Sequence, residues 1–148
     1  MSDFKTLLVT TDFSDAALPG VETAGRLAAA LGARIVLLYV VEDRLPPLLY
    51  GVTELDRNDL LAQHCRKAEV SLAEYAAKHL PGTPTEVCVH TGMPHREILA
   101  CAEQRGADMI VIATHGYGNV GQLVFGSTAQ RVIHHAHCPV VTVRSHPD

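Results

Sequence analysis

The sequence predicts an α/β protein built on one doubly wound, flavodoxin-like sheet of five parallel strands, with helices on both faces. Two observations lead to this class. Strand-like and helix-like segments alternate along the whole chain, as parallel connections require. Most strand-like segments are also near-continuous apolar runs, which is typical of parallel strands buried on both faces. The strand-like segments are Lys5–Thr11, Arg34–Val41, Thr85–His90, Met109–Thr114 and Val140–Arg144.

The first half of the chain holds two expected helices and one long irregular segment. An alanine-rich helix is expected over Asp15–Leu31, because Gly32 follows as a suitable C-terminal cap. A second helix is expected over Asp59–His79, where apolar residues recur at helical spacing. The intervening segment Asp43–Asn58 contains two prolines and is expected to be irregular, either as a lid or as a simple loop.

The second half holds two further helices, expected over Pro94–Arg105 and Ser127–His135. Proline in a first turn and glycine after the last turn favour the first of these. The third strand, Thr85–His90, is shorter and mixed in polarity, as an edge strand would be. We therefore expect the strand order 3-2-1-4-5 in a single domain spanning residues 1–148.

Composition excludes several classes of function. The net charge is −4 and no basic stripe is present, so nucleic acid is not an expected partner. No apolar run approaches the length of a membrane span. The first residues lack the pattern of a signal peptide, and the four cysteines form no C-x-x-C pair, which fits free thiols in a reducing compartment. We expect a cytoplasmic protein that does not insert into membranes.

Strand ends indicate where a ligand would lie. In open parallel sheets, ligands bind beyond the carboxyl ends of the strands, at the point where the strand order reverses. Three strand ends should meet there: Thr10, Thr11 and Asp12 after the first strand, Val40 after the second, and Ala113, Thr114 and His115 after the fourth.

A glycine-rich loop joins the fourth strand to the last helix, in a region that holds no carboxylate between Asp108 and Asp148. A strand, such a loop and a helix N-terminus together are a common phosphate-binding arrangement. The run Gly116–Gly121 matches G-x-G-x-x-G, but it follows the wrong strand for a dinucleotide fingerprint and lacks a downstream acid. It is not a Walker A loop either, because no lysine follows. A merely flexible surface loop remains the alternative.

A different spacing in the same region is more specific. The spacing resembles the G-x-x-G-x9-G-[S/T] nucleotide motif of the universal stress protein family. Here the motif would read Ala113-x-x-Gly116, then nine residues, then Gly126-Ser127. Similar elements recur along the whole chain, at the acidic turn after the first strand, at Gly92-Met93-Pro94 and at Cys138–Val143. The resemblance implies an adenine-nucleotide-hydrolase-like fold that binds ATP, ADP or AMP, with or without Mg²⁺.

The resemblance also implies roles for individual residues. Asp12 would contact the ribose and the Val40 backbone the adenine edge. Backbone groups of Gly116, Gly118 and Asn119 would line the phosphates, and Ser127 and Thr128 would cap them. The full expected set is Thr10, Thr11, Asp12, Val40, Ala113, Thr114, His115, Gly116, Tyr117, Gly118, Asn119, Gly126, Ser127, Thr128 and Ala129. Two positions depart from the family pattern: Ala113 replaces a glycine, and Tyr117 stands where a basic residue is frequent.

Catalytic and metal sites are not predicted. No nucleophile elbow or catalytic triad is present, although slow ATP hydrolysis or autophosphorylation stays open. His134, His135 and His137 fit the end of a helix, where they satisfy free carbonyls, better than a metal site. We expect a stress-response regulatory protein that forms a homodimer through Val140–Arg144, because an unprotected apolar edge strand favours pairing. The alternative is a dimeric interaction module whose pocket binds no nucleotide. The sequence does not identify a downstream partner.

Overall fold

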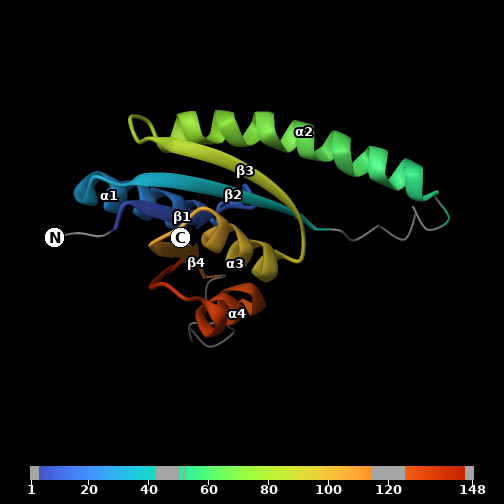
Figure 1. Ribbon diagram of the computed structural model, residues 1–148. Helices are drawn as coiled ribbons and strands as arrows, with labels where there is room; N and C mark the ends of the chain where they lie inside the picture. The colour runs from blue at the N-terminus through green and yellow to red at the C-terminus, as the bar shows by residue number, and fades with distance from the viewer. Residues whose placement is uncertain (1–3, 43–50, 52, 115–125, 146–148) are drawn as a thin grey trace.

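The computed structural model describes residues 4–42, 51, 53–114 and 126–145. Its five strands form one parallel sheet in the order β3-β2-β1-β4-β5, which confirms the expected fold (Figure 1). The elements in chain order are β1 Thr6–Thr10, α1 Leu18–Leu31, β2 Arg34–Glu42, α2 Glu54–His79, β3 Thr85–Gly92, α3 Pro94–Gln104, β4 Met109–Ala113, α4 Ser127–His135 and β5 Val140–Val143.

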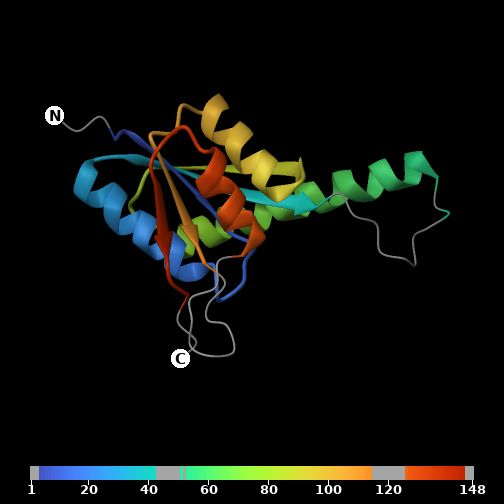
Figure 2. The ribbon, with the colours of Figure 1, turned by 90° about the horizontal axis from the view of Figure 1, so that it is seen from below.

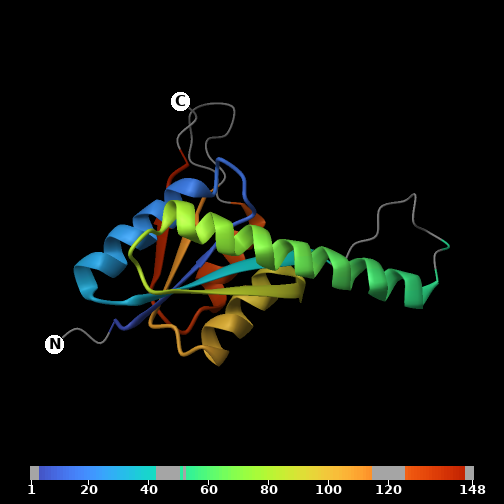
Figure 3. The same cartoon turned by 90° about the horizontal axis from the view of Figure 1, so that it is seen from above.

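Helices cover both faces of the sheet. Figure 3 shows α1 and α2 on one face, and Figure 2 shows α3 and α4 on the other. Alternate residues of the central strand enter two separate cores: Leu7 and Val9 pack with α1 and α2, whereas Leu8 packs with α3 and α4. This division follows from the two-residue period of a strand. Continuous apolar runs are therefore what a sheet covered on both faces needs.

Two helix starts differ from the expected ones. α1 begins at Leu18 rather than Asp15, because the chain first makes a turn in which the Ala17 amide bonds the Ser14 carbonyl at 3.2 Å. α2 begins at Glu54, five residues before the expected start. The side chain of Thr53 caps it by accepting a bond from the Asp56 amide at 3.2 Å. Glu54–Asn58 is thus helical, and residues 43–50 and 52 of the segment expected to be irregular lie outside the described residues.

The N-terminal half of α2 extends beyond the sheet (Figures 1 and 3). Its buried residues are Ala68, Leu72 and Ala76, spaced four apart, and all lie in the second half of the helix. The first half therefore lies beside the carboxyl end of the sheet rather than on its face.

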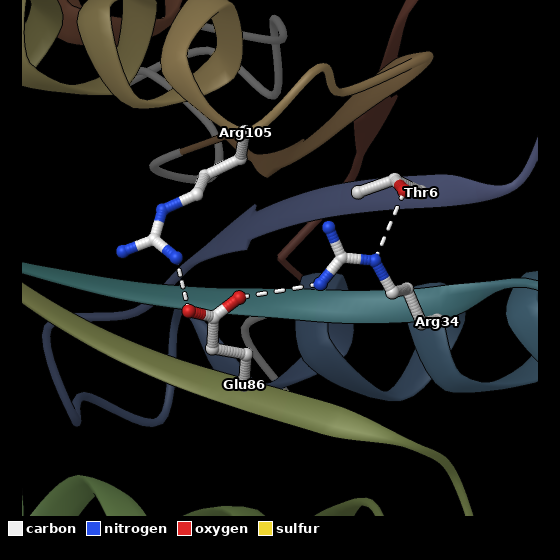
Figure 4. A network of polar contacts seen from close by, with 4 residues as sticks. All are labelled: Thr6, Arg34, Glu86 and Arg105. Atoms are coloured by element: carbon white, nitrogen blue, oxygen red, sulfur yellow. Dashed lines mark hydrogen bonds and ion pairs between the residues drawn. The ribbon is translucent and has the colours of Figure 1, made fainter.

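A polar network joins the amino-terminal ends of three strands, at the end of the sheet opposite to the one beside α2 (Figure 4). One carboxylate, Glu86 of β3, contacts the guanidinium groups of both Arg34 and Arg105, and Arg34 Nε also donates to Thr6 Oγ1 at 3.2 Å. The charged side chains of Arg34, Glu86 and Arg105 are more than a third exposed, so each ion pair contributes little free energy of folding. The network links the starts of β1, β2 and β3 to the end of α3. It therefore lies at the end of the sheet away from the expected ligand site.

Candidate functional site

A cavity of about 500 Å³ opens at the carboxyl ends of β1, β2 and β4. This is where the strand order reverses, since the chain runs from β1 outward to β3 and then returns to β4. The first turn of α4, the residues before α1, the start of α3 and one residue of α2 complete its wall. We call this cavity the crevice.

Many of the residues predicted from the sequence line the crevice together. They are Thr10, Thr11, Asp12, Val40, Ala113, Thr128 and Ala129. Gly126 and Ser127 immediately precede two of these at the start of α4. The predicted residues His115, Gly116, Tyr117, Gly118 and Asn119 lie outside the described part of the chain.

Thr114 has a different environment from the one expected. It is buried, and its amide donates to the Val143 carbonyl at 2.8 Å, which extends the pairing of β4 with β5. Its hydroxyl bonds the same carbonyl at 3.4 Å. The buried hydroxyl of Ser145 reaches the carbonyls of both Thr114 and Ala16. Thr114 follows the crevice residue Ala113 but is not itself among the lining residues, and its bonds tie the end of β4 to the C-terminal strand.

The turn after β1 fixes the carboxylate of Asp12 at the crevice. Asp12 Oδ1 accepts from the Ser14 amide at 2.9 Å and from the Ser14 hydroxyl, and Thr11 Oγ1 accepts from the Phe13 amide at 3.0 Å. Phe13 has a φ of 67°, which is uncommon for a residue with a large side chain. Its ring packs on Tyr39 at 4.9 Å and on Tyr75 at 5.5 Å between centroids. Side-chain bonds and aromatic packing thus hold the turn together.

The N-terminus of α4 is suited to an anion. Gly126 occupies the cap position with a φ of −64°, no side chain of the described residues caps this end, and the first turn contains no acidic residue. Amides of a first helical turn have no partner within the helix, and they carry the positive end of the helix dipole. An anion at the crevice end of α4 would bond them.

Some crevice residues were not predicted from the sequence. Tyr39 and Glu42 belong to β2, and His64 comes from the overhanging half of α2. The His64 and Tyr39 rings lie 6.4 Å apart. Burial raises the pKa of the Tyr39 hydroxyl, and the negative charges of Asp12, Cys65 and Glu42 raise it further. No local pattern marks His64, because its position depends on the direction in which α2 crosses the end of the sheet.

Other classes of site receive no support from the described residues. No three His, Cys, Asp or Glu side chains lie close enough to hold a metal ion there. His134 and His135 occupy the last turn of α4, with their rings 6.4 Å apart. None of the described helices is long and apolar enough to cross a membrane.

Comparison with known proteins identifies relatives along the whole chain. Residues 3–144 match the model of the universal stress protein family. A universal stress protein of Thermus aquaticus is 37% identical over 142 residues, which cover 95% of this chain and 99% of that protein. Among solved structures, MJ0577 of Methanocaldococcus jannaschii has a TM-score of 0.81 at 27% identity, over 99% of this chain and 100% of that one. A universal stress protein in complex with cAMP shares the fold, with a TM-score of 0.65 at 23% identity over 98% and 100% of the two chains.

Proposed function

The chain belongs to the universal stress protein family, and from this premise we propose that it binds an adenine nucleotide in the crevice and acts as a nucleotide-dependent regulatory dimer. The observation that supports the proposal most is the meeting of three groups in one cavity. Asp12 in the turn after β1, the end of β2 at Val40 and the start of α4 all border it.

Each group suits one part of a nucleotide. The Val40 backbone would bond the adenine edge, and the Asp12 carboxylate would accept from a ribose hydroxyl. The amides at Ser127 and Thr128, at the start of α4, would bond a phosphate. A universal stress protein of the same fold is in complex with cAMP, whose base is adenine, and this supports an adenine nucleotide as the class of ligand.

A melting-temperature panel with ATP, ADP, AMP, cAMP and GTP tests the proposal, each with Mg²⁺. A ligand that binds only the folded state stabilises it by about 4 kcal/mol at a thousandfold excess over its dissociation constant. We expect adenine nucleotides to raise the melting temperature more than GTP does. No shift with any adenine nucleotide at millimolar concentration would instead support the alternative, a dimeric interaction module that binds no nucleotide.

Variants at the start of α4 test the location. Gly126→Val should abolish binding without unfolding the protein, because the φ of −64° suits any residue while the branched side chain would occupy the phosphate position. Gly126→Ala, which adds only a methyl group, should have a smaller effect. Ser127→Ala should weaken binding by only about 1 kcal/mol, because the backbone donors remain.

A further inference from the structure

A second hollow lies on the face of the sheet that α3 and α4 cover. These two helices pack side by side (Figures 1 and 2), and a hollow of about 610 Å³ opens between α3 and the end of α4. We call it the α3–α4 groove. Small apolar side chains leave this space open, because its lining includes Ala100, Ala102, Ala107 and Ala136 beside Leu99 and Ile110. The described residues that line it are all different from those of the crevice, so the groove is a separate surface.

Positive side chains from both helices border the groove. Arg96 of α3 and His135 of α4 line it together. Arg131 stands four residues before His135, and therefore on the same face of α4. His95, next to Arg96, lies near the same groups: its pKa is lowered first by burial and then by the positive charges of Arg131, Arg96 and His135. We call these four side chains the basic cluster.

Few carboxylates oppose the basic cluster. The sequence has no Asp or Glu between Asp108 and Asp148, so neither α4 nor the segment that joins it to β4 supplies one. On α3, Glu97 is paired with His90 at 3.2 Å. Glu103 borders the groove, but it stands about two helical turns after Arg96.

The two arginines of the basic cluster are exposed, and among the residues that the structure describes neither forms an ion pair. A permanent positive charge on each of two adjacent helices, next to an apolar hollow, is thus open to a partner. Protein interfaces combine an apolar centre with a polar rim, and arginine is enriched among the residues that dominate their binding energy.

We infer that the α3–α4 groove docks an acidic segment of a partner protein, which places carboxylates on the basic cluster and an apolar side chain over the alanines. The net charge of the whole chain is −4, so the attraction is local to this cluster. A short acidic segment therefore fits it better than a long polyanion such as nucleic acid. The inference goes beyond the proposed function and does not require a nucleotide in the crevice.

Selection of short random peptides displayed on phage, with the full chain as bait, tests the chemistry of the partner. We expect the enriched peptides to combine several Asp or Glu residues with a Leu, Ile or Phe. The most enriched peptide is then synthesised with a fluorescent label and titrated with the protein by anisotropy. The same peptide with Gln and Asn in place of Glu and Asp should bind about tenfold more weakly, because its charge pairs are lost.

A pair of charge-matched double variants tests the location. Arg96→Gln combined with Arg131→Gln should weaken binding of the acidic peptide roughly three- to tenfold, since two exposed charge pairs are removed. Arg66→Gln combined with Lys67→Gln makes the same change in net charge at exposed positions of α2, on the other face of the sheet, and should bind as the wild type does.

Filling the groove tests the apolar contact independently of charge. Ala100→Leu places a larger side chain in the groove and keeps a good helix former, so it should weaken binding about tenfold with the melting temperature nearly unchanged. Ala73→Leu, at an exposed position of α2, should leave binding unchanged. If Ala100→Leu fails to fold, the charge-matched variants decide the location alone.

Several results would overturn the inference. No enrichment of peptides, or enrichment of peptides without carboxylates, excludes an acidic partner. Equal binding by the two charge-matched double variants excludes the basic cluster as its site. Tighter binding of a short DNA duplex, or of phosphatidylserine vesicles, than of the acidic peptide would assign the cluster to phosphates rather than to a protein segment.

Discussion

Gly20 of α1 and Ala113 of β4 pack so closely that a Cβ atom at position 20 would lie 3.2 Å from both the Cβ and the backbone nitrogen of Ala113. Ala113 is the position at which the family motif has glycine, and Gly20 leaves the space that its methyl group needs beside α1. Met109 and Val111 of the same strand also belong to the core under α1. The methyl group of Ala113, which the family motif lacks, is therefore accommodated on the face of β4 that α1 covers.

Gly20→Ala should destabilise the fold by about 1 kcal/mol, because overpacking costs about 1–3 kcal/mol and the better helix propensity of alanine offsets about 1 kcal/mol. Chemical denaturation measures the change. Gly25→Ala is the matched control in the same helix, since its Cβ would meet only the end of the Leu80 side chain. Ala113→Gly in the Gly20→Ala background should restore part of the loss. Equal stability of the Gly20→Ala and Gly25→Ala proteins would contradict this packing.

Ser145→Ala should lower the free energy of unfolding by about 1–2 kcal/mol, because it deprives buried carbonyls of a donor. The Ser145 hydroxyl reaches Ala16 and Thr114, and Ala16 lines the crevice. Ser71→Ala, on the exposed face of α2, should stay within about 0.5 kcal/mol of wild type. Urea denaturation of both variants is the measurement. A Ser145→Ala protein as stable as the Ser71→Ala protein would show that the hydroxyl does not hold the C-terminal segment.

His64→Ala should weaken the binding of adenosine and AMP by about 1 kcal/mol, because the His64 and Tyr39 rings offer aromatic surface at the end of the crevice nearest β2. His79→Ala is the control. His79 is also on α2 and packs on an aromatic ring, that of Tyr75, with centroids 4.4 Å apart, but it does not line the crevice. Equilibrium dialysis compares the two. Equal affinities would exclude a role for His64 in holding the base.

Sequence reasoning succeeded where a property repeats along several residues, as in the apolar strands and their order. The crevice residues at strand ends, such as Thr10 and Val40, were predictable because parallel strands all end at one edge. Single contacts between distant segments were not predictable. His64 reaches the crevice only because α2 extends past the sheet, and the start of α2 depended on a cap at Thr53 that the two prolines before it obscured.

Stability should fall as the pH rises above about 9, partly through Cys101. Burial, with a smaller effect of Cys88, raises the pKa of the Cys101 thiol to about 11, above the value of an exposed thiol. Because the pKa of this thiol is higher in the folded state, its protonated form adds to the stability of the fold. That added stability is complete below the pKa that the thiol has in the unfolded chain, and it is lost as the pH rises toward 11. Cys101→Ala should flatten the loss of stability between about pH 9 and 11. Cys65→Ala is the thiol control, and identical slopes for wild type and Cys101→Ala would refute the assignment.

The open edge of β5 is the expected dimer contact. The carbonyls of Pro139 and Val143 accept bonds from the amides of Ile110 and Thr114, so these alternate residues of the strand turn their backbone groups toward β4. The backbone groups of Thr142 must then point to the open edge. The side chain of Val141 already packs against the core of its own chain. A variant that tests the dimer should therefore change the Thr142 backbone and leave Val141 intact.

Thr142→Pro should convert a dimer into a monomer, because proline removes the outward N–H without touching the ladder to β4, and edge strands tolerate proline there. Thr142→Ala keeps the N–H and should remain dimeric. Sedimentation measures the mass against the 15.9 kDa of one chain. Wild type and Thr142→Ala should give twice that mass at tens of micromolar, and Thr142→Pro should give it once with its melting temperature nearly unchanged. A wild type that stays monomeric, or a Thr142→Pro protein that stays dimeric, would show that β5 is not the contact.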